Sequence, residues 1–226
     1  MPAKVRVTPA PRLMPTVSGQ VKWLFSSKFE KGVSLKERSD LFLLQMAGTS
    51  GVGKSTLAQH VAQETTSVVI DYDVVKSAAL EAGISWDMSG RVGYRASHAI
   101  AGSLLEQGIS VILDSPCRFE FIVDSGVALA TKHNGLYAFI ECVLADENEL
   151  RRRMQSRKRQ RSQRVAFDEK PTDAPSDVME DEAGKIIVPE TKYPTSRWLQ
   201  VDTSELVEQN VKQSLAYLKS LLANAK

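Results

Sequence analysis

The stretch GTSGVGKS, from Gly48 to Ser55, decides the fold because it fits the phosphate-binding pattern G-x-x-x-x-G-K-[ST]. An apolar run at 41–47, LFLLQMA, precedes it and predicts a buried strand, and residues 55–63 follow it with the apolar spacing of a helix. The glycines allow successive backbone N–H groups to point into one concavity, where the start of the helix adds partial positive charge. The stretch therefore predicts a strand, a phosphate-binding loop and a helix, in that order.

The two polar residues that end this stretch have distinct expected roles. Lys54 is placed to reach the outer phosphates of a nucleoside triphosphate, and the Ser55 hydroxyl is a hard oxygen ligand suited to the accompanying Mg²⁺. A glycine-rich turn without a ligand is the alternative, but it would not explain the strand and helix on either side. The expected nucleotide-binding residues of the loop are Gly48, Thr49, Ser50, Gly51, Val52, Gly53, Lys54, Ser55 and Thr56.

The composition is that of a globular protein with a sizeable core. The chain has 226 residues, 42% of them hydrophobic and 25% charged, and its net charge of +2 does not by itself indicate nucleic-acid binding. No apolar run approaches the roughly 20 residues that cross a bilayer. The two cysteines, Cys117 and Cys142, lack the spacing of a metal site. We therefore expect a cytoplasmic protein, a monomer or weak dimer, with no membrane partner.

Residues 1–40 form an extension before the predicted domain. The first 29 residues carry five basic side chains and no acidic one, as a transit peptide does. Four prolines between positions 2 and 15 would nevertheless break the amphipathic helix that such peptides form. We therefore predict a flexible arm, with organellar targeting as the alternative.

Beyond the loop, short apolar runs alternate with helical patterns. This alternation predicts an α/β domain at 41–226 with a five-stranded parallel sheet and helices on both faces. The further predicted strands are 67–71, 110–114, 137–144 and 198–202, and the further predicted helices are 74–82, 91–107, 120–133, 147–159 and 205–222.

The segment 162–197 interrupts the alternation. It contains four prolines, and an acidic stretch at 168–182 follows a basic one at 151–164. Such a composition opposes a packed core. We place a lid and insertion at about 151–197 and predict that its part at 162–197 is a mobile lid extension, which orders when bound phosphates neutralise the arginines beneath it. A merely tolerated surface insertion is the alternative.

Three acids end predicted strands, where ligands bind in open parallel sheets. Asp71 and Asp73 end the second strand, and a period of two makes them project the same way. One carboxylate there can orient Mg²⁺, and the other can accept a proton from an attacking hydroxyl. Capping of the helix at 74–82 is the alternative for Asp73. Asp114 ends the third strand in the pattern of a Walker B metal acid, with a turn before Ser115 as the alternative.

Arginines dominate residues 151–164. On a continuous helix Arg153 and Arg157 share a face, and Arg161 continues it one turn later. A guanidinium there can stabilise the charge that spreads over a phosphoryl group during transfer. A solvated face and a nucleic-acid contact are the alternatives.

An acceptor pocket is expected beside the helix at 91–107. Arg91 and Arg95 lie near one face of this helix together with His98, and Arg118 can approach from beyond the third strand. A lone histidine is more often structural than catalytic. The expected acceptor-binding residues are therefore Asp73, Arg91, Arg95 and Arg118.

Taken together, these motifs make the chain resemble the P-loop small-molecule kinases, most closely those of the zeta-toxin, chloramphenicol phosphotransferase and polynucleotide kinase type. The resemblance covers residues 41–222 and implies a P-loop NTPase, nucleotide kinase-like fold. The D-x-D motif is similar to that of shikimate kinases, which implies that Asp71 serves the metal and Asp73 is the base. Similarity to the lid helix implies that Arg153 lies near the adenine and that Arg157 or Arg161 lies over the phosphates. By the same resemblance, the turn after the last strand runs beside the adenine, which would place Thr203 next to it.

The resemblance implies an ATP-dependent kinase that uses Mg²⁺ and moves the γ-phosphoryl group to a hydroxyl of a small molecule. The catalytic residues would be Lys54, Asp73 and Arg157, and the metal would be held by Ser55, Asp71 and Asp114. A polynucleotide 5′-hydroxyl kinase is the alternative enzyme. A non-catalytic, nucleotide-gated binding module is the alternative outside enzymes.

Overall fold

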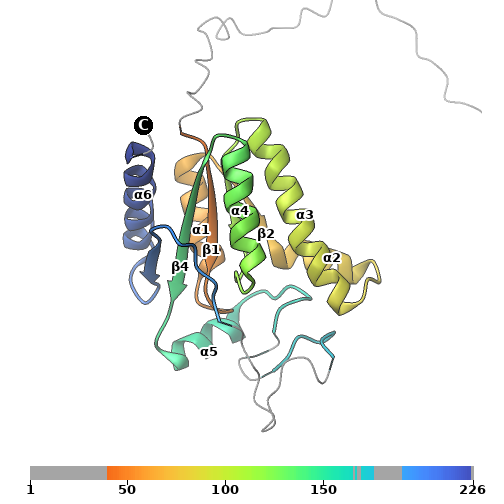
Figure 1. Ribbon diagram of the computed structural model, residues 1–226. Coiled ribbons are helices and arrows are strands. Elements are labelled where there is room, and N and C mark those ends of the chain that lie inside the picture. The colour runs from red at the N-terminus through yellow and green to blue at the C-terminus, as the bar shows by residue number, and fades with distance from the viewer. Residues whose placement is uncertain (1–39, 165, 167–168, 176–189, 225–226) are drawn as a thin grey trace, which may run out of the picture. The chain divides into compact units, whose positions relative to one another are not determined.

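The computed structural model describes residues 40–164, 166, 169–175 and 190–224. Five strands within these residues form one sheet in the order β2-β3-β1-β4-β5, and each neighbouring pair is parallel. The predicted five-stranded parallel sheet is therefore confirmed (Figure 1). The arm predicted at 1–40 lies outside the described residues except for its last one. The strands are β1 (Phe42–Ala47), β2 (Val68–Asp71), β3 (Val111–Asp114), β4 (Leu136–Val143) and β5 (Leu199–Asp202).

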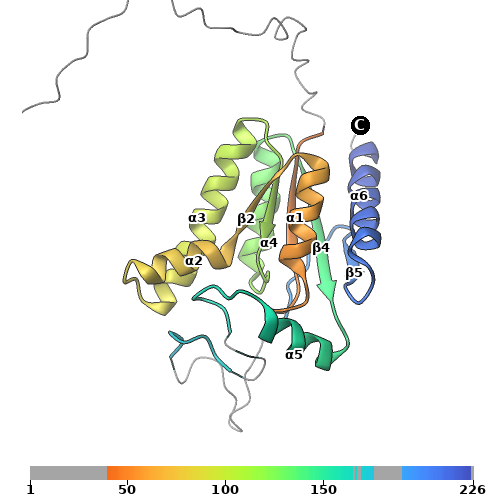
Figure 2. The same ribbon diagram turned by 180° about the vertical axis from the view of Figure 1, so that it is seen from behind.

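Helices cover both faces of the sheet, as the alternating pattern predicted. Contacts place α1 and α6 on one face and α3 and α4 on the other, which the two views show in turn (Figures 1 and 2). The helices α2 and α5 lie beyond the carboxyl ends of the strands. No helix in the described part of the chain is long and apolar enough to span a membrane. The helices are α1 (Lys54–Thr65), α2 (Tyr72–Glu81), α3 (Trp86–Glu106), α4 (Glu120–Lys132), α5 (Glu147–Ser156) and α6 (Val207–Asn224).

Three helix boundaries differ from the prediction in ways that matter for the site. The helix α3 begins at Trp86 rather than at 91, so its unpredicted first turns bring Trp86, Asp87 and Gly90 to the site. The helix α2 begins at Tyr72 rather than at 74, because the Asp71 carboxylate caps it by accepting hydrogen bonds from the N–H groups of Asp73 (2.8 Å) and Val74 (3.3 Å). The helix α5 ends at Ser156 rather than at 159, where the backbone turns to an extended conformation. The new start of α2 and the new end of α5 change the expected positions of side chains that lie near the phosphate-binding loop.

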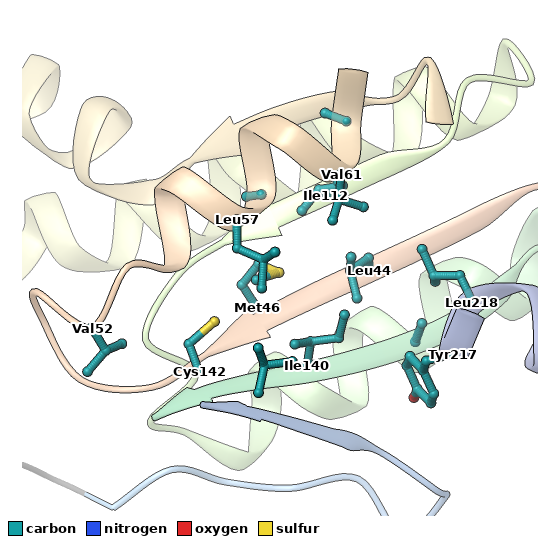
Figure 3. Close-up of a cluster of buried hydrophobic side chains, with 14 of the residues drawn as sticks. Leu44, Met46, Val52, Leu57, Val61, Ile112, Ile140, Cys142, Tyr217 and Leu218 are labelled. Carbon is teal, nitrogen blue, oxygen red and sulfur yellow. The ribbon is translucent and has the colours of Figure 1, made fainter. Parts of the chain in front are cut away.

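The core on one face of the sheet joins β1 and β4 to the helices α1 and α6. Leu44, Met46, Val61 and Ile140 have no exposed surface there, and Figure 3 shows them with their neighbours. Each fully buried aliphatic side chain contributes about 1.5–3 kcal/mol to folding by leaving water. This packing fixes the ends of β1 and α1, and therefore the loop between them.

One polar side chain is fully buried inside the otherwise apolar β1. Gln45 donates hydrogen bonds through Nε2 to the carbonyl of Met46 (2.6 Å) and to Oγ of Ser115 (2.9 Å). Ser115 follows directly after β3. These bonds hold the carboxyl ends of two neighbouring strands together, at the edge of the sheet where the site lies.

Candidate active site

A cavity of about 1340 Å³ opens beyond the carboxyl ends of the strands. One end is lined by the phosphate-binding loop and the start of α1, and the other by α2, the start of α3 and the segment after β3. Residues after α5 close over it from a third direction. The cavity is therefore large enough for a nucleotide and a second small molecule.

The loop curls as its glycines predicted. Gly51 and Gly53 have φ angles of 89° and 99°, which L side chains rarely adopt, and Gly53 is the N-cap residue just before α1. A β-carbon at Gly51 would lie 2.6 Å from Cγ of Met154, so the loop also packs directly against α5. Of the predicted loop residues, the cavity is lined by Ser50, Gly51, Gly53, Lys54, Ser55 and Thr56.

The remaining loop residues support the curl from behind. Val52 is 2% exposed and packs in the core, and a β-carbon at Gly48 would overlap the carbonyl oxygen of Cys142. Thr49 offers its carbonyl to Nζ of Lys54 at 2.8 Å. The lysine is thus held within the loop, at the position where phosphate oxygens would compete for its ammonium group.

Lys54 sits among the acids at the strand ends. Burial lowers the pKa of its ammonium group, and the nearby Asp114 opposes that shift. Burial raises the pKa of the Asp114 carboxyl, whereas Lys54 and the Ser55 hydroxyl lower it. The three side chains therefore form one electrostatic unit of a cation, an anion and a hydroxyl at the floor of the cavity.

The strand-end acids meet as predicted, but not through the geometry that predicted it. Asp71 and Asp114 are direct neighbours in the register of β2 and β3. Asp73 lies in the first turn of α2 rather than on an extended strand, so the period-two argument was wrong, yet all three acids line the cavity. The capping role that we allowed for Asp73 belongs to Asp71.

The acids and the Ser55 hydroxyl suit a magnesium ion. Burial and the charges of Asp114 and Asp73 raise the pKa of Asp71 to about 6, which shows an excess of negative charge that a cation would relieve. Mg²⁺ prefers oxygen ligands and keeps several waters. In the described part of the chain, no group of three or more His, Cys, Asp or Glu could enclose a metal. A Mg²⁺ here would therefore share its ligands with water and phosphate.

Asp73 is held by two residues that follow α5. Ser162 donates from Oγ to Oδ1 of Asp73 at 3.1 Å, and Gln163 donates from Nε2 to Oδ2 at 2.9 Å. Ser162 is also tied to Ser77 of α2, through its backbone N–H (3.0 Å) and its hydroxyl (3.1 Å). Both carboxylate oxygens thus have a donor from a segment about 90 positions away along the chain.

Two arginines after β4 contact different parts of the nucleotide end of the cavity. Arg153 donates to the carbonyl of Thr203 at 2.9 Å, and both residues line the cavity. Arg157 donates from Nη1 to Oγ of Ser50 in the loop at 3.2 Å. These positions agree with a nucleotide role for each.

Arg161 is the exception among the predicted nucleotide-binding residues. It is exposed, pairs with Asp173 at 2.8 Å and does not line the cavity. The prediction assumed that α5 continues to residue 161. Because α5 ends at Ser156, the helical spacing no longer carries Arg161 onto the face of Arg153.

Among the arginines predicted to bind the acceptor, two line the cavity and one does not. Arg91 and Arg118 line the cavity, and burial lowers the pKa of the Arg118 guanidinium. Arg95 is exposed on α3 and does not line the cavity, one turn beyond the part of the helix that does. The site therefore gains two of the three arginines.

Sequence reasoning missed several residues at the acceptor end. Lys76 lies three positions after Asp73 on α2, so a correct start for that helix would have placed both on one face. Ser162 and Gln163 carry no spacing or composition signal. The missed aromatic lining consists of Tyr72, Trp86, Tyr94, Phe119 and Phe121.

The comparison with known proteins agrees with this geometry. The family model described as AAA domain matches residues 43–183. The chain belongs to the AAA domain family. The shikimate kinase of Photobacterium profundum is 28% identical to this AAA-domain protein over 159 residues, which are 66% of this chain and 77% of the relative. That of Vibrio vulnificus is 28% identical over 162 residues, which are 67% of this chain and 80% of the relative.

Solved structures of kinases have the same fold. A protein assigned as a kinase from Chloroflexus aurantiacus matches this AAA-domain protein with a TM-score of 0.56 and 25% identity, over 80% of this chain and 98% of that one. APS kinase from Mycobacterium tuberculosis matches with a TM-score of 0.57 and 15% identity, over 79% and 98% of the two chains. The second likeness shows the fold alone.

These findings confirm the predicted α/β P-loop NTPase fold and the prediction of an ATP-dependent kinase. The narrower resemblance, to kinases of the zeta-toxin type, stays a prediction. So do the cytoplasmic location and the oligomeric state.

Proposed function

We propose that this AAA-domain protein transfers the γ-phosphoryl group of ATP to a hydroxyl group of a small molecule. One observation carries the proposal: a single cavity has the phosphate-binding loop at one end, a cationic and aromatic lining at the other, and Asp73 between them. The relatives named as shikimate kinases support a small-molecule acceptor.

The chain's own groups divide the reaction between them. Asp73 accepts the proton of the acceptor hydroxyl while the oxygen of that hydroxyl attacks the γ-phosphorus. The bond from the γ-phosphorus to the β–γ bridging oxygen then breaks. Lys54 and Arg157 stabilise the charge on the transferring oxygens. ATP becomes ADP, and the acceptor becomes a phosphate ester.

Magnesium would be held by Ser55, Asp71 and Asp114. When bound, it supplies positive charge next to the phosphate oxygens, as in other phosphoryl transfer enzymes. Asp71 can serve it through the carboxylate oxygen that does not cap α2. Arg153 and Thr203 would flank the adenine, and the zeta-toxin-like subgroup is the narrower family we propose.

The direct test is a screen of ATP consumption by the full chain against a library of hydroxyl compounds that includes a short oligonucleotide. We expect a small molecule to stimulate ADP release, and Lys54→Ala to abolish the stimulation without loss of folding. Stimulation by the oligonucleotide alone would instead assign a polynucleotide kinase. No turnover with any acceptor would favour a nucleotide-gated binding module.

A further inference from the structure

Three cationic side chains from separate elements line the acceptor end of the cavity. Lys76 comes from α2, Arg91 from α3 and Arg118 from the segment after β3. Two carboxylates, Asp73 and Asp87, line the same end. In the described part of the chain none of these three cations is part of a salt bridge.

Two of these cations are desolvated by the protein and form no ion pair. Burial lowers the pKa of Lys76 to about 8, against the opposing charges of Asp73 and Asp87. Burial also lowers the pKa of Arg118, against the influence of Tyr94 and Asp73. A buried charge is costly unless it is paired, so this end of the cavity favours a ligand that brings negative charge.

Aromatic rings line the same end of the cavity. Tyr72 and Tyr94 stack with their ring centres 4.1 Å apart, and Tyr94 meets the edges of Phe119 at 6.0 Å and Phe121 at 5.7 Å. Phe119 and Phe121 stack on each other, and about half of each is exposed. Exposed aromatic faces inside a cavity favour a flat, apolar ring as partner.

A glycine on α3 lets that helix pack closely against Tyr72 at this end. A β-carbon at Gly93 would lie 2.8 Å from Cε2 of Tyr72, so only glycine lets α3 approach the tyrosine this closely. A β-carbon at Gly90 would lie 3.5 Å from the Tyr72 hydroxyl and 4.0 Å from Nζ of Lys76. The ammonium group of Lys76 also lies 3.2 Å from the centre of the Trp86 ring, which fixes its direction.

We propose that the acceptor is an anionic ring compound, whose carboxylate or phosphate is bound by Lys76 and Arg118 and whose flat ring packs against Phe119 and Phe121. This inference rests on the proposed function, because it names the acceptor of that reaction. It assigns Lys76, Trp86 and the two phenylalanines to substrate recognition. Neutral acceptors, including unmodified sugars, leave both buried cations without an anion and bind poorly.

Binding of small probes tests the proposal without turnover. The full chain, with Mg²⁺ and a non-hydrolysable ATP analogue, is titrated with benzoate, benzyl alcohol and acetate, and binding is followed by ligand-observed NMR. We expect benzoate to bind at least about tenfold more tightly than benzyl alcohol, which lacks the charge, and than acetate, which lacks the ring. Equal binding of benzyl alcohol and benzoate overturns the anionic half of the proposal, and equal binding of acetate overturns the ring.

Variants locate the binding to this end of the cavity. Lys76→Met and Arg118→Met are each expected to weaken benzoate by about tenfold, since each removes a charged partner. Phe119→Leu keeps apolar volume on an exposed position and is expected to weaken benzoate but not acetate. Lys219→Met, on an exposed position of α6 across the sheet, is the matched control and is expected to change nothing. Benzoate binding that is insensitive to Lys76, Arg118 and Phe119 in folded variants overturns the assignment.

The proposed function can fail separately. If the wild-type protein does not bind the ATP analogue, the nucleotide site is contradicted, whether or not benzoate binds. Retained analogue binding with no preference for benzoate contradicts the acceptor class alone.

Discussion

The two ends of the cavity are built in different ways. The phosphate end is a single loop of consecutive residues, Gly48 to Ser55, and much of its binding power comes from backbone N–H groups. The acceptor end is assembled from side chains of α2, α3, the segment after β3 and residues 162–163. A contiguous backbone site leaves a motif in the sequence, whereas an assembled side-chain site leaves none.

The same difference separates two tasks within one pocket, the binding of phosphates and the selection of an acceptor. Every nucleoside triphosphate presents the same phosphates, so a loop that binds phosphate suits any kinase of this fold. We propose that the acceptor end, lined by Lys76, Arg118 and the aromatic rings, decides which hydroxyl compound reacts. Variants at each end should therefore have distinguishable kinetic effects.

The largest effect is expected for Asp73→Asn, which keeps the shape of the side chain and removes the base. General-base catalysis contributes about 10²–10⁴-fold, so kcat should fall by that factor while the affinity for ATP changes little. Steady-state kinetics with the best acceptor of the screen measures both. A larger loss in Asp71→Asn that extra Mg²⁺ does not restore would show that the roles of the two acids are reversed.

Variants of Arg157 and Arg161 form a matched pair, because Arg157 lines the phosphate end of the cavity and Arg161 lies outside it. Arg157→Ala should lower kcat by about 10²–10³-fold, because removing one donor to a transferring group typically costs that much. Arg161→Ala should leave kcat/KM within about twofold, since an exposed ion pair contributes at most about 1 kcal/mol. Equal losses in the two variants would return Arg161 to the site and contradict the observed end of α5.

The acceptor end is expected to respond to pH through Lys76. Its pKa is lowered to about 8, so the ammonium group loses its charge as the pH rises through that value, while Asp73, Asp87, Arg118 and Tyr72 face it. The KM for an anionic acceptor should therefore rise by up to about tenfold above pH 8, with the KM for ATP much less affected. Lys76→Met should abolish this rise. An unchanged KM from pH 7 to 9.5 in the wild-type protein would show that Lys76 does not contact the acceptor.

Among the variants expected to impair the reaction, Gln163→Ala should have the smallest effect. It removes one of the two donors that hold the Asp73 carboxylate, and a single hydrogen bond to a charged group changes a rate by about fivefold or more. We expect kcat to fall and the KM for ATP to stay unchanged, because the phosphate loop is untouched. Gln155→Ala, at an exposed position of α5, is the control. A fall in melting temperature without a change in kcat would assign Gln163 to structure alone.

The centre of the sheet could be predicted from the sequence because β1 and β3 are apolar runs that are buried on both sides, whereas the edge strands β2 and β5 are partly exposed. Val111 to Leu113 and Leu43 to Ala47 have almost no exposed surface, so their composition alone marks them as strands. The helix boundaries were less legible. Asp71 can end a strand and cap a helix at once, and only the packing of α2 decides where the helix starts.

The site could be predicted where chain order implies position. Strand-end acids and the loop meet because parallel strands share one carboxyl edge, and the structure places Asp114 near Lys54, as that order implies. Arg95 and Arg161 were placed by helical spacing alone, and spacing fails when a helix ends early or leaves the cavity. The contact of Ser162 with Asp73 depends on how the chain folds back after α5, which no local pattern records. The part of the predicted insertion at 176–189 lies outside the described residues.

The central claim is that the two ends of this cavity cooperate in moving a phosphoryl group from ATP to a small-molecule hydroxyl. Its most direct test follows ATP labelled in the γ-phosphate, in reactions of the wild-type, Lys54→Ala and Asp73→Asn proteins with the best acceptor. The account predicts that the wild-type protein places the label in an ester of the acceptor, that Asp73→Asn binds ATP but transfers almost none, and that Lys54→Ala loses both. Label released only as inorganic phosphate, or equal transfer in wild-type and Asp73→Asn proteins, would contradict it.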